Sequence, residues 1–233
     1  MSFSTTGMIH FDKVSKVYPD NSIALEDVSF SVEPKEFVSI VGHSGAGKTT
    51  LIKMFLAEES PTKGKIFFES TDIHTLNKSQ INDFRRKVGV VFQDFRLLLH
   101  KNIYENIAFA MEASGRTDEE IEADVPHVLG LVDLGKKIWN FPSELSGGEQ
   151  QRVAIARAIV NQPDVIIADE PTGNLDPLNT YDVVQILKKI NDLGTTVILT
   201  THNKGVIDSL GKRVLTMENG KIVRDDKQGK YII

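Results

Sequence analysis

One stretch decides the fold class: Gly42-His43-Ser44-Gly45-Ala46-Gly47-Lys48-Thr49. This phosphate loop matches the pattern G-x-x-x-x-G-K-[ST], in which glycines let backbone N–H groups approach a phosphate with no Cβ in the way. Lys48 supplies a mobile positive charge for the β- and γ-phosphates, and the Thr49 hydroxyl is placed to ligate Mg²⁺. The sequence therefore predicts a site for ATP with Mg²⁺.

The residues around the phosphate loop predict a parallel sheet. The continuous apolar run Phe37–Val41 is typical of a strand covered on both faces, and a helix is expected over Lys48–Leu56, with its positive N-terminal end toward the anion. Buried-strand composition returns at Val165–Ala168 and Thr196–Thr200, with a helix expected over Asn179–Leu193 between them. That succession is a βαβ unit.

The first third of the chain contains further strand candidates. Ile9–Val14 and Ala24–Val32 alternate apolar and polar residues, as half-buried strands do. Gly64–Phe68 and Val88–Phe92 are also expected to be strands. From Asp94 to about Val160 the pattern becomes helical. We therefore expect an α/β nucleotide-binding core made of residues 1–93 and 161–233, interrupted by a helical subdomain at 94–160.

The composition limits the function classes. The chain has 233 residues, 40% hydrophobic and 25% charged, as soluble globular proteins do. A formal charge of −5 argues against general nucleic-acid binding. Without cysteine, the chain has no disulfide, thiol catalysis or Cys-based zinc site. The N-terminus lacks a signal-peptide pattern, and no apolar run approaches the roughly 18 residues of a membrane helix. We expect a soluble protein whose membrane role needs a partner.

Two carboxylates end one of the predicted buried strands, since Asp169-Glu170 follows Val165–Ala168. Such groups are costly unless charges or hydrogen bonds meet them, and beside a phosphate loop the natural partners are Mg²⁺ and the attacking water. Asp169 would hold the metal shell through water. Glu170, which points the other way by strand alternation, would orient or deprotonate the attacking water. The alternative is an exposed acidic strand end before Pro171.

A sharper signal is the signature segment, Leu145-Ser146-Gly147-Gly148-Glu149-Gln150. It resembles the signature motif of the ATP-binding-cassette (ABC) ATPases. Taken by itself, Ser146 with Glu149 has the spacing of a capping box, which an ordinary helix start also shows. A helix start of this kind is also an anion site.

Other parts of the ABC pattern follow in the family's order over nearly all of Ile9 to Arg224. Tyr18 lies where the family stacks an aromatic ring on adenine; the alternative is that it simply packs at a strand end. Gln93 matches the glutamine of the loop that enters the helical subdomain. His202 matches the histidine that senses the γ-phosphate; on its own it would be an ordinary polar residue at a strand end. Gly173-Asn174-Leu175-Asp176 resembles the turn after the catalytic glutamate.

The resemblance implies an α/β P-loop NTPase (RecA-like) core with an N-terminal antiparallel β-subdomain and an inserted α-helical ABC subdomain. The catalytic residues would be Lys48, Gln93, Glu170 and His202. The metal would be held by Thr49, Gln93 and, through water, Asp169. ATP would contact Tyr18, Gly42, His43, Ser44, Gly45, Ala46, Gly47, Lys48, Thr49, Thr50, Ser146, Gly147, Gly148 and Glu149.

The resemblance also implies that Ser146 and Gly148 face the γ-phosphate of ATP bound to a second copy. The chain carries one phosphate loop and one signature segment. Two complete sites therefore need two chains arranged head to tail, so we expect an ATP-dependent homodimer.

Within the family, two stretches resemble a bacterial cell-division subgroup: Gln93–Leu98 and Tyr104–Ala110. That resemblance implies an integral membrane partner at the cytoplasmic face of the membrane, contact with cytoplasmic division proteins, and mechanical signalling to cell-wall hydrolases. One alternative is the ATPase subunit of a lipoprotein-release, macrolide-export or other transporter. A second is an ATP-gated scaffold with little hydrolysis, against which Gln93, Glu170 and His202 argue. ABC proteins of DNA repair or the ribosome fit less well.

Overall fold

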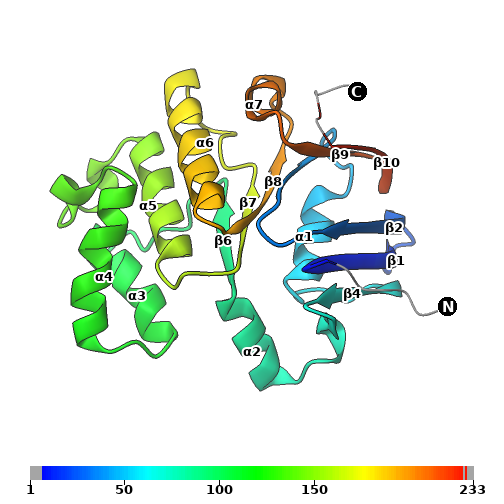
Figure 1. Cartoon of the computed structure of the whole chain (residues 1–233), viewed down its shortest axis with the longest axis horizontal. Helices are drawn as coiled ribbons and strands as arrows, with labels where there is room; N and C mark the ends of the chain where they lie inside the picture. The colour runs from blue at the N-terminus through cyan, green and yellow to red at the C-terminus, as the bar shows by residue number, and fades with distance from the viewer. Residues whose placement is uncertain (1–6, 228, 230–233) are drawn as a thin grey trace.

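The computed structural model describes residues 7–227 and residue 229. The prediction that the N-terminus lacks a signal peptide falls partly on residues 1–6, which lie outside the described residues. One sheet runs through the middle of the molecule, with an antiparallel sheet on one side and a group of helices on the other (Figure 1). Among the helices of the described part, none has the length and apolarity needed to span a bilayer.

The central sheet has six strands in the order β10-β9-β3-β8-β7-β6. Its strands are β3 (Phe37–Val41), β6 (Val88–Phe92), β7 (Val165–Asp169), β8 (Thr196–Thr201), β9 (Arg213–Glu218) and β10 (Lys221–Asp226). The pairs β3–β8, β3–β9, β7–β8 and β6–β7 are parallel, and β10 pairs antiparallel with β9. Every residue of β3 and β8 is buried, as in strands covered on both faces.

The antiparallel sheet has the order β2-β1-β4-β5. Its strands are β1 (Ile9–Val17), β2 (Ile23–Val32), β4 (Lys63–Phe68) and β5 (Thr71–Asp72). Helix α1 (Lys48–Phe55) shares one hydrophobic core with this sheet and with one face of the central sheet. Phe11 and Phe30 stack in that core with ring centroids 4.6 Å apart.

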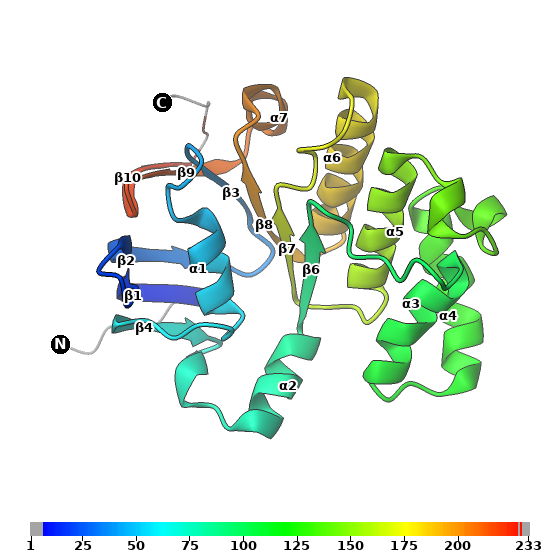
Figure 2. The ribbon, with the colours of Figure 1, turned by 180° about the vertical axis from the view of Figure 1, so that it is seen from behind.

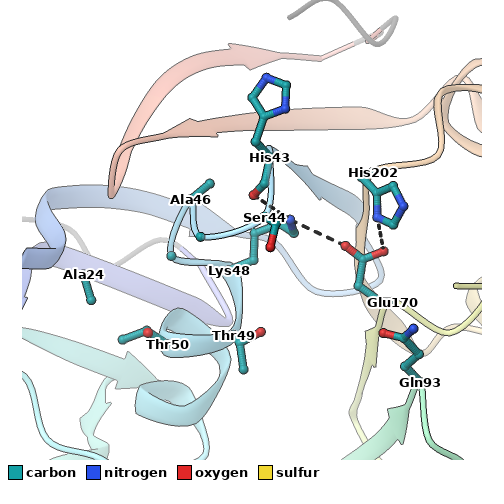
Figure 3. Close-up of a pocket in the computed structure, with 12 residues that line it drawn as sticks. Ala24, His43, Ser44, Ala46, Lys48, Thr49, Thr50, Gln93, Glu170 and His202 are labelled. Carbon is teal, nitrogen blue, oxygen red and sulfur yellow. Dashed lines mark hydrogen bonds and ion pairs between the residues drawn. The ribbon is translucent and has the colours of Figure 1, made fainter.

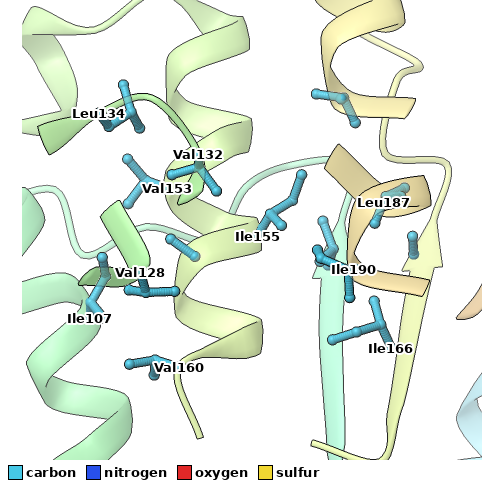
Figure 4. Close-up of a cluster of buried hydrophobic side chains, with 14 of the residues drawn as sticks. Ile107, Val128, Val132, Leu134, Val153, Ile155, Val160, Ile166, Leu187 and Ile190 are labelled. Carbon is cyan, nitrogen blue, oxygen red and sulfur yellow. The ribbon is translucent and has the colours of Figure 1, made fainter. Parts of the chain in front are cut away.

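A second core lies on the other face of the central sheet. There α3 (Ile103–Ala113), α4 (Asp118–Leu131), α5 (Gly147–Ile159) and α6 (Pro177–Asp192) pack together (Figure 4). Strand alternation divides β7 between the two cores, because Ile166 faces the helices and Ile167 faces α1. The view from behind shows α2 (Lys78–Arg86) below β6 and α7 (Lys204–Leu210) beside β9 (Figure 2). Short 3₁₀ turns are η1 (Ile73–Thr75), η2 (Gly135–Lys137) and η3 (Pro142–Glu144).

Each predicted strand is present, and the helices differ from prediction mainly at their ends. Within the stretch expected to be helical, α3 starts at Ile103, because the Asn102 side chain accepts from the backbone N of Glu105 and so forms the N-cap. Helix α6 starts at Pro177, two residues before the predicted start, because Asp176 caps it. The capping box at Ser146 is confirmed, and Thr117 forms another at the start of α4.

Candidate functional site

The phosphate loop joins β3 to α1 and borders a cavity of about 510 Å³ (Figure 3). Two of its glycines are required by close approaches of the backbone. A Cβ at Gly47, whose φ is +105°, would lie 2.6 Å from the carbonyl oxygen of Ala24, and a Cβ at Gly42 would lie 2.4 Å from that of Met217. Any larger residue would push the loop off the two strands that hold it.

Lys48 is the cation of this cavity. Its side chain is only 8% exposed, and its Nζ donates to the carbonyl oxygens of Gly42, at 2.7 Å, and His43, at 3.2 Å. The same Nζ lies 3.5 Å from Oε1 of Glu170 (Figure 3). The charge is therefore held over the loop by backbone oxygens and balanced by one carboxylate.

Glu170 lies directly after β7 and faces the phosphate loop. Its φ of +48° is unusual for a residue with a side chain, and strain of this kind is often stored at functional sites. Its backbone N donates to the carbonyl oxygen of Thr200, at 3.0 Å, which fixes the turn. Its Oε2 lies 2.9 Å from Nδ1 of His202, whose side chain is 65% exposed. The structure thus brings together Lys48, Glu170 and His202.

Asp169 is the last residue of β7 and directly precedes Glu170. The hydroxyl of Thr200 donates to its Oδ1 at 2.5 Å. Burial raises the pKa of Asp169, and the charge of Glu170 adds to that rise, whereas the Thr200 hydrogen bond and the charges of Lys48 and Arg96 oppose it. Its carboxylate therefore lacks a full counter-charge within the protein.

This raised pKa makes a stability prediction for Asp169→Asn. Because the pKa of Asp169 is higher in the folded state than in the unfolded state, its ionised form destabilises the fold. This destabilisation is absent below about pH 4 and grows as the pH rises through the raised pKa. Asp169→Asn should therefore raise the thermal midpoint of the nucleotide-free protein at pH 7, and the gain should vanish near pH 4. The exposed Asp192→Asn is the matched control. A gain that persists undiminished at pH 4 would show that burial of this charge is not its cause.

Gln93 follows β6 and lines the cavity with Thr49 and Thr50. Its Nε2 donates to Oδ1 of Asn174 at 3.2 Å, and a Cβ on Gly173 would lie 2.7 Å from that Nε2. The loop at Gln93 and the Gly173–Asp176 turn are therefore in direct contact.

The donor set of this cavity fits Mg²⁺. This cation prefers oxygen ligands, and it commonly takes one or two carboxylates besides phosphate oxygens and water. The hydroxyl of Thr49 and the amide of Gln93 both line the cavity, and Asp169 ends the strand beside Glu170. In the described residues no group of three or more His, Asp or Glu side chains could hold a metal by itself. Such a set suits a cation that a nucleotide would bring.

Tyr18 does not line the cavity. Its hydroxyl lies 3.3 Å from the Thr50 hydroxyl and donates to Oε1 of Glu59 at 3.2 Å. Lys16 Nζ lies 5.3 Å from the ring centroid. The ring is thus anchored at the edge of the phosphate-loop region, and stacking on adenine stays a prediction.

The signature segment lies at the start of α5, away from this cavity (Figure 1). Ser146 caps the helix by accepting from the backbone N of Glu149 at 3.3 Å. Oε1 of Glu149 accepts from Nζ of Lys137 at 2.5 Å, and this contact is the main reason its pKa is lowered. Ser146, Gly147, Gly148 and Glu149 are therefore not brought to the phosphate loop of the same chain.

Reasoning from the sequence missed three residues that support the site. Thr200 forms hydrogen bonds with both Asp169 and Glu170. The backbone of Ala24 packs against the phosphate loop at Gly47, and Lys137 donates a hydrogen bond to Glu149. Nothing in the local sequence marks Ala24 or Lys137, because their roles depend on contacts between distant segments. Thr200 could have been found, since it ends the strand next to β7.

Comparisons with known proteins agree with this geometry. The family model described as ABC transporter matches residues 25–173. The cell division ATP-binding protein FtsE of Bacillus subtilis is 51% identical over 96% of this chain and 98% of its own length. FtsE of Mycobacterium tuberculosis is 45% identical, with coverage of 96% and 98%. FtsE of Escherichia coli K12 is 42% identical, with coverage of 92% and 97%.

Solved structures confirm the predicted cassette fold. The dimeric cassette MJ0796, in a post-hydrolysis state bound to ADP and Pi, has a TM-score of 0.85 and 33% identity, and the match covers 96% of this chain and 100% of that one. CbiO1 of Clostridium perfringens, part of an ABC transporter complex, has a TM-score of 0.88 and 27% identity, with coverage of 96% and 89%.

Proposed function

The chain belongs to the ABC transporter family and is an ABC ATPase, and from that membership we propose that it drives a bacterial cell-division complex in the manner of FtsE. The observation that carries this proposal is the identity of 42–51% to proteins named FtsE over 92–96% of the chain. ATP would close a dimer in the cytoplasm and change the shape of a membrane partner, FtsX, which would activate cell-wall hydrolases. Cytoplasmic division proteins are further partners.

We propose that the cavity residues perform hydrolysis by positioning and electrostatics. Lys48 would exchange its two loop carbonyls for the β- and γ-phosphates. Thr49, Gln93 and, through water, Asp169 would hold Mg²⁺, whose chemistry is to neutralise charge on the phosphates. Glu170 would accept a proton from the attacking water, and His202 would hydrogen-bond the γ-phosphate.

The contacts of Glu170 support these roles. Its carboxylate spans Lys48 and His202, with distances of 3.5 Å and 2.9 Å. These are the two side chains expected to meet the γ-phosphate. An arriving phosphate would therefore replace the carboxylate on both, leaving Glu170 able to face water.

A second copy would complete each site. The signature segment is remote from its own cavity, yet its helix start leaves backbone N–H groups without intrahelical partners, which suits an anion. Two solved relatives, 33% and 34% identical to this chain, are described as dimeric, which supports a pair of chains. We therefore propose a homodimer in which the phosphate loop of one copy and Ser146–Glu149 of the other enclose ATP.

The membrane partner would dock in a groove of about 680 Å³ between α2, β6, α3 and α5. This arginine groove lies between the proposed core (1–93 and 161–233) and the proposed helical subdomain (94–160). Phe109, which is 49% exposed, gives it an apolar wall. Its four arginines are Arg85, Arg86, Arg96 and Arg157.

The arginine groove favours an acidic partner segment. The chain as a whole carries a charge of −5, so this positive cluster is a local departure. Arg85 and Arg157 donate hydrogen bonds to backbone carbonyl oxygens. Because these oxygens carry no formal charge, the bonds do not neutralise the two guanidinium charges. The ion pairs of Arg86 with Asp83 and of Arg96 with Asp94 are exposed to solvent. A short acidic and apolar helix of the membrane partner fits these surroundings.

Arg86→Glu should separate docking from catalysis. Arg86 is 51% exposed on α2 and outside the nucleotide cavity, so basal ATP hydrolysis should stay unchanged. Binding to the membrane partner should weaken by about tenfold or more, because a rim charge would be reversed. Co-purification from detergent extracts, with the complex assayed at low salt, measures this.

Lys63→Glu, an exposed charge reversal on β4, is the matched control and should bind the partner normally. Equal binding by Arg86→Glu and the parent would exclude the arginine groove as the docking site.

The function itself is tested by the membrane protein that co-purifies from native cells. A partner with a large domain outside the cytoplasm, and loss of division when either protein is removed, would support the proposal. Substrate translocation by the purified complex would favour a transporter instead. A complex with no turnover above its Glu170→Gln variant would favour an ATP-gated scaffold. If the proposal holds, the chain is a peripheral protein at the cytoplasmic face of the membrane.

A further inference from the structure

Gly148 is packed against α6 within its own chain. It is buried at the second position of α5. A Cβ there would lie 1.8 Å from Oδ1, 2.3 Å from Cγ and 2.8 Å from Cβ of Asn179. These distances are shorter than any real contact allows, so a larger residue would have to displace Asn179 or move the start of α5. Asn179 therefore lies directly beneath the signature segment.

Asn179 is itself held firmly at the start of α6. Its Nδ2 donates to Oδ2 of Asp176 at 2.5 Å, and its backbone N donates to Oδ1 at 3.0 Å. A carboxylate only accepts, so the amide nitrogen faces Asp176 and the amide oxygen faces Gly148. The bond from the Asn179 backbone is the main reason that the pKa of Asp176 is lowered. The two residues thus form one rigid unit.

Two other loops of the site meet at the same place. The Cβ position of Gly147 lies 3.7 Å from Cδ2 of Leu175 and 3.9 Å from Cζ of Phe95. Leu175 belongs to the Gly173–Asp176 turn, and Phe95 follows Gln93. The start of α5 therefore rests on a floor made by Phe95, Leu175 and Asn179.

We propose that Asn179 is a positioning residue, which sets the height of the signature segment above the Gly173–Asp176 turn. Through this contact it would fix how the N–H groups at the start of α5 meet the γ-phosphate held by the second copy. The inference rests on the proposed composite site. It assigns to Asn179 an effect on the neighbouring copy's nucleotide and none on its own phosphate loop.

The test uses ATP-driven dimerisation of the full chain in a Glu170→Gln background, followed by light scattering with Mg·ATP. Gly148→Ala should weaken dimerisation by about tenfold or more, because the added methyl lifts the start of α5. Adding Asn179→Gly should restore part of it by removing the three nearest atoms that the methyl meets. Adding Asn179→Ala, which keeps the Cβ 2.8 Å away, should restore less.

Controls separate positioning from damage. ADP affinity of each monomer should stay within about twofold of the parent, since the phosphate loop is untouched. Gly148→Ala with Lys189→Gly, which places a glycine elsewhere in α6, should show no rescue. Equal dimerisation of Gly148→Ala with and without Asn179→Gly, in proteins with normal ADP affinity, would overturn the proposal. A parent that fails to dimerise would instead contradict the composite site.

Discussion

Replacing Glu170 with glutamine should slow ATP hydrolysis by about two to four orders of magnitude while ATP binding is kept, because a general base contributes on that scale. Glutamine preserves the shape of the side chain beside His202 but cannot accept the proton of the attacking water. It also removes the negative charge that lies 3.5 Å from Lys48. Bound ATP should therefore persist, and the closed dimer should accumulate.

Steady-state phosphate release and light scattering with Mg·ATP check this result together. Glu58→Gln, an exposed change of the same kind beyond the end of α1, is the matched control and should hydrolyse ATP normally. A strictly monomeric Glu170→Gln protein would count heavily against the composite site. Turnover equal to the parent would remove Glu170 from the role of base.

Replacing Lys48 with alanine should weaken ATP binding by about 30-fold or more. Truncating one partner of a buried charge pair costs about 2 to 5 kcal/mol, and about 1.4 kcal/mol corresponds to tenfold. Lys48 is 8% exposed, and its charge lies over the cavity on two backbone carbonyls. The phosphates would lose this charge, and Glu170 would be left facing them without it.

Equilibrium binding of a fluorescent ATP analogue measures the loss. Lys53→Ala is the matched control, since Lys53 lies on the same helix but is 46% exposed and pairs only with Glu59. Normal affinity in Lys48→Ala would contradict the assignment of the phosphate loop. A comparable loss in Lys53→Ala would point to a disturbed helix and not to the missing charge.

The strands and the phosphate loop could be predicted because their signals are local. Phe37–Val41 and Val88–Phe92 have the predicted bounds, since strands largely buried on both faces are mostly apolar. Helix starts were harder, because a cap such as Asp176 extends a helix before its apolar pattern begins.

Contacts between distant segments could not be predicted. The sequence placed Lys48, Glu170 and His202 in one site, but their pairing depends on how the loops after three strands meet. The approach of Asn179 to Gly148 is of the same kind, since α5 and α6 are separated along the chain by β7. Tyr18 shows the limit most clearly, because its hydroxyl partners at Thr50 and Glu59 carry no sequence signal.

The distance of the signature segment from its own cavity has a consequence for inheritance. In the proposed dimer, each copy contributes its phosphate loop to one site and its signature segment to the other. A copy defective at Lys48 and a copy defective at Ser146 would then place both faults in one site and leave the other whole. Two alleles that each abolish the function alone would complement one another in the same cell, whereas two alleles at Lys48 would not.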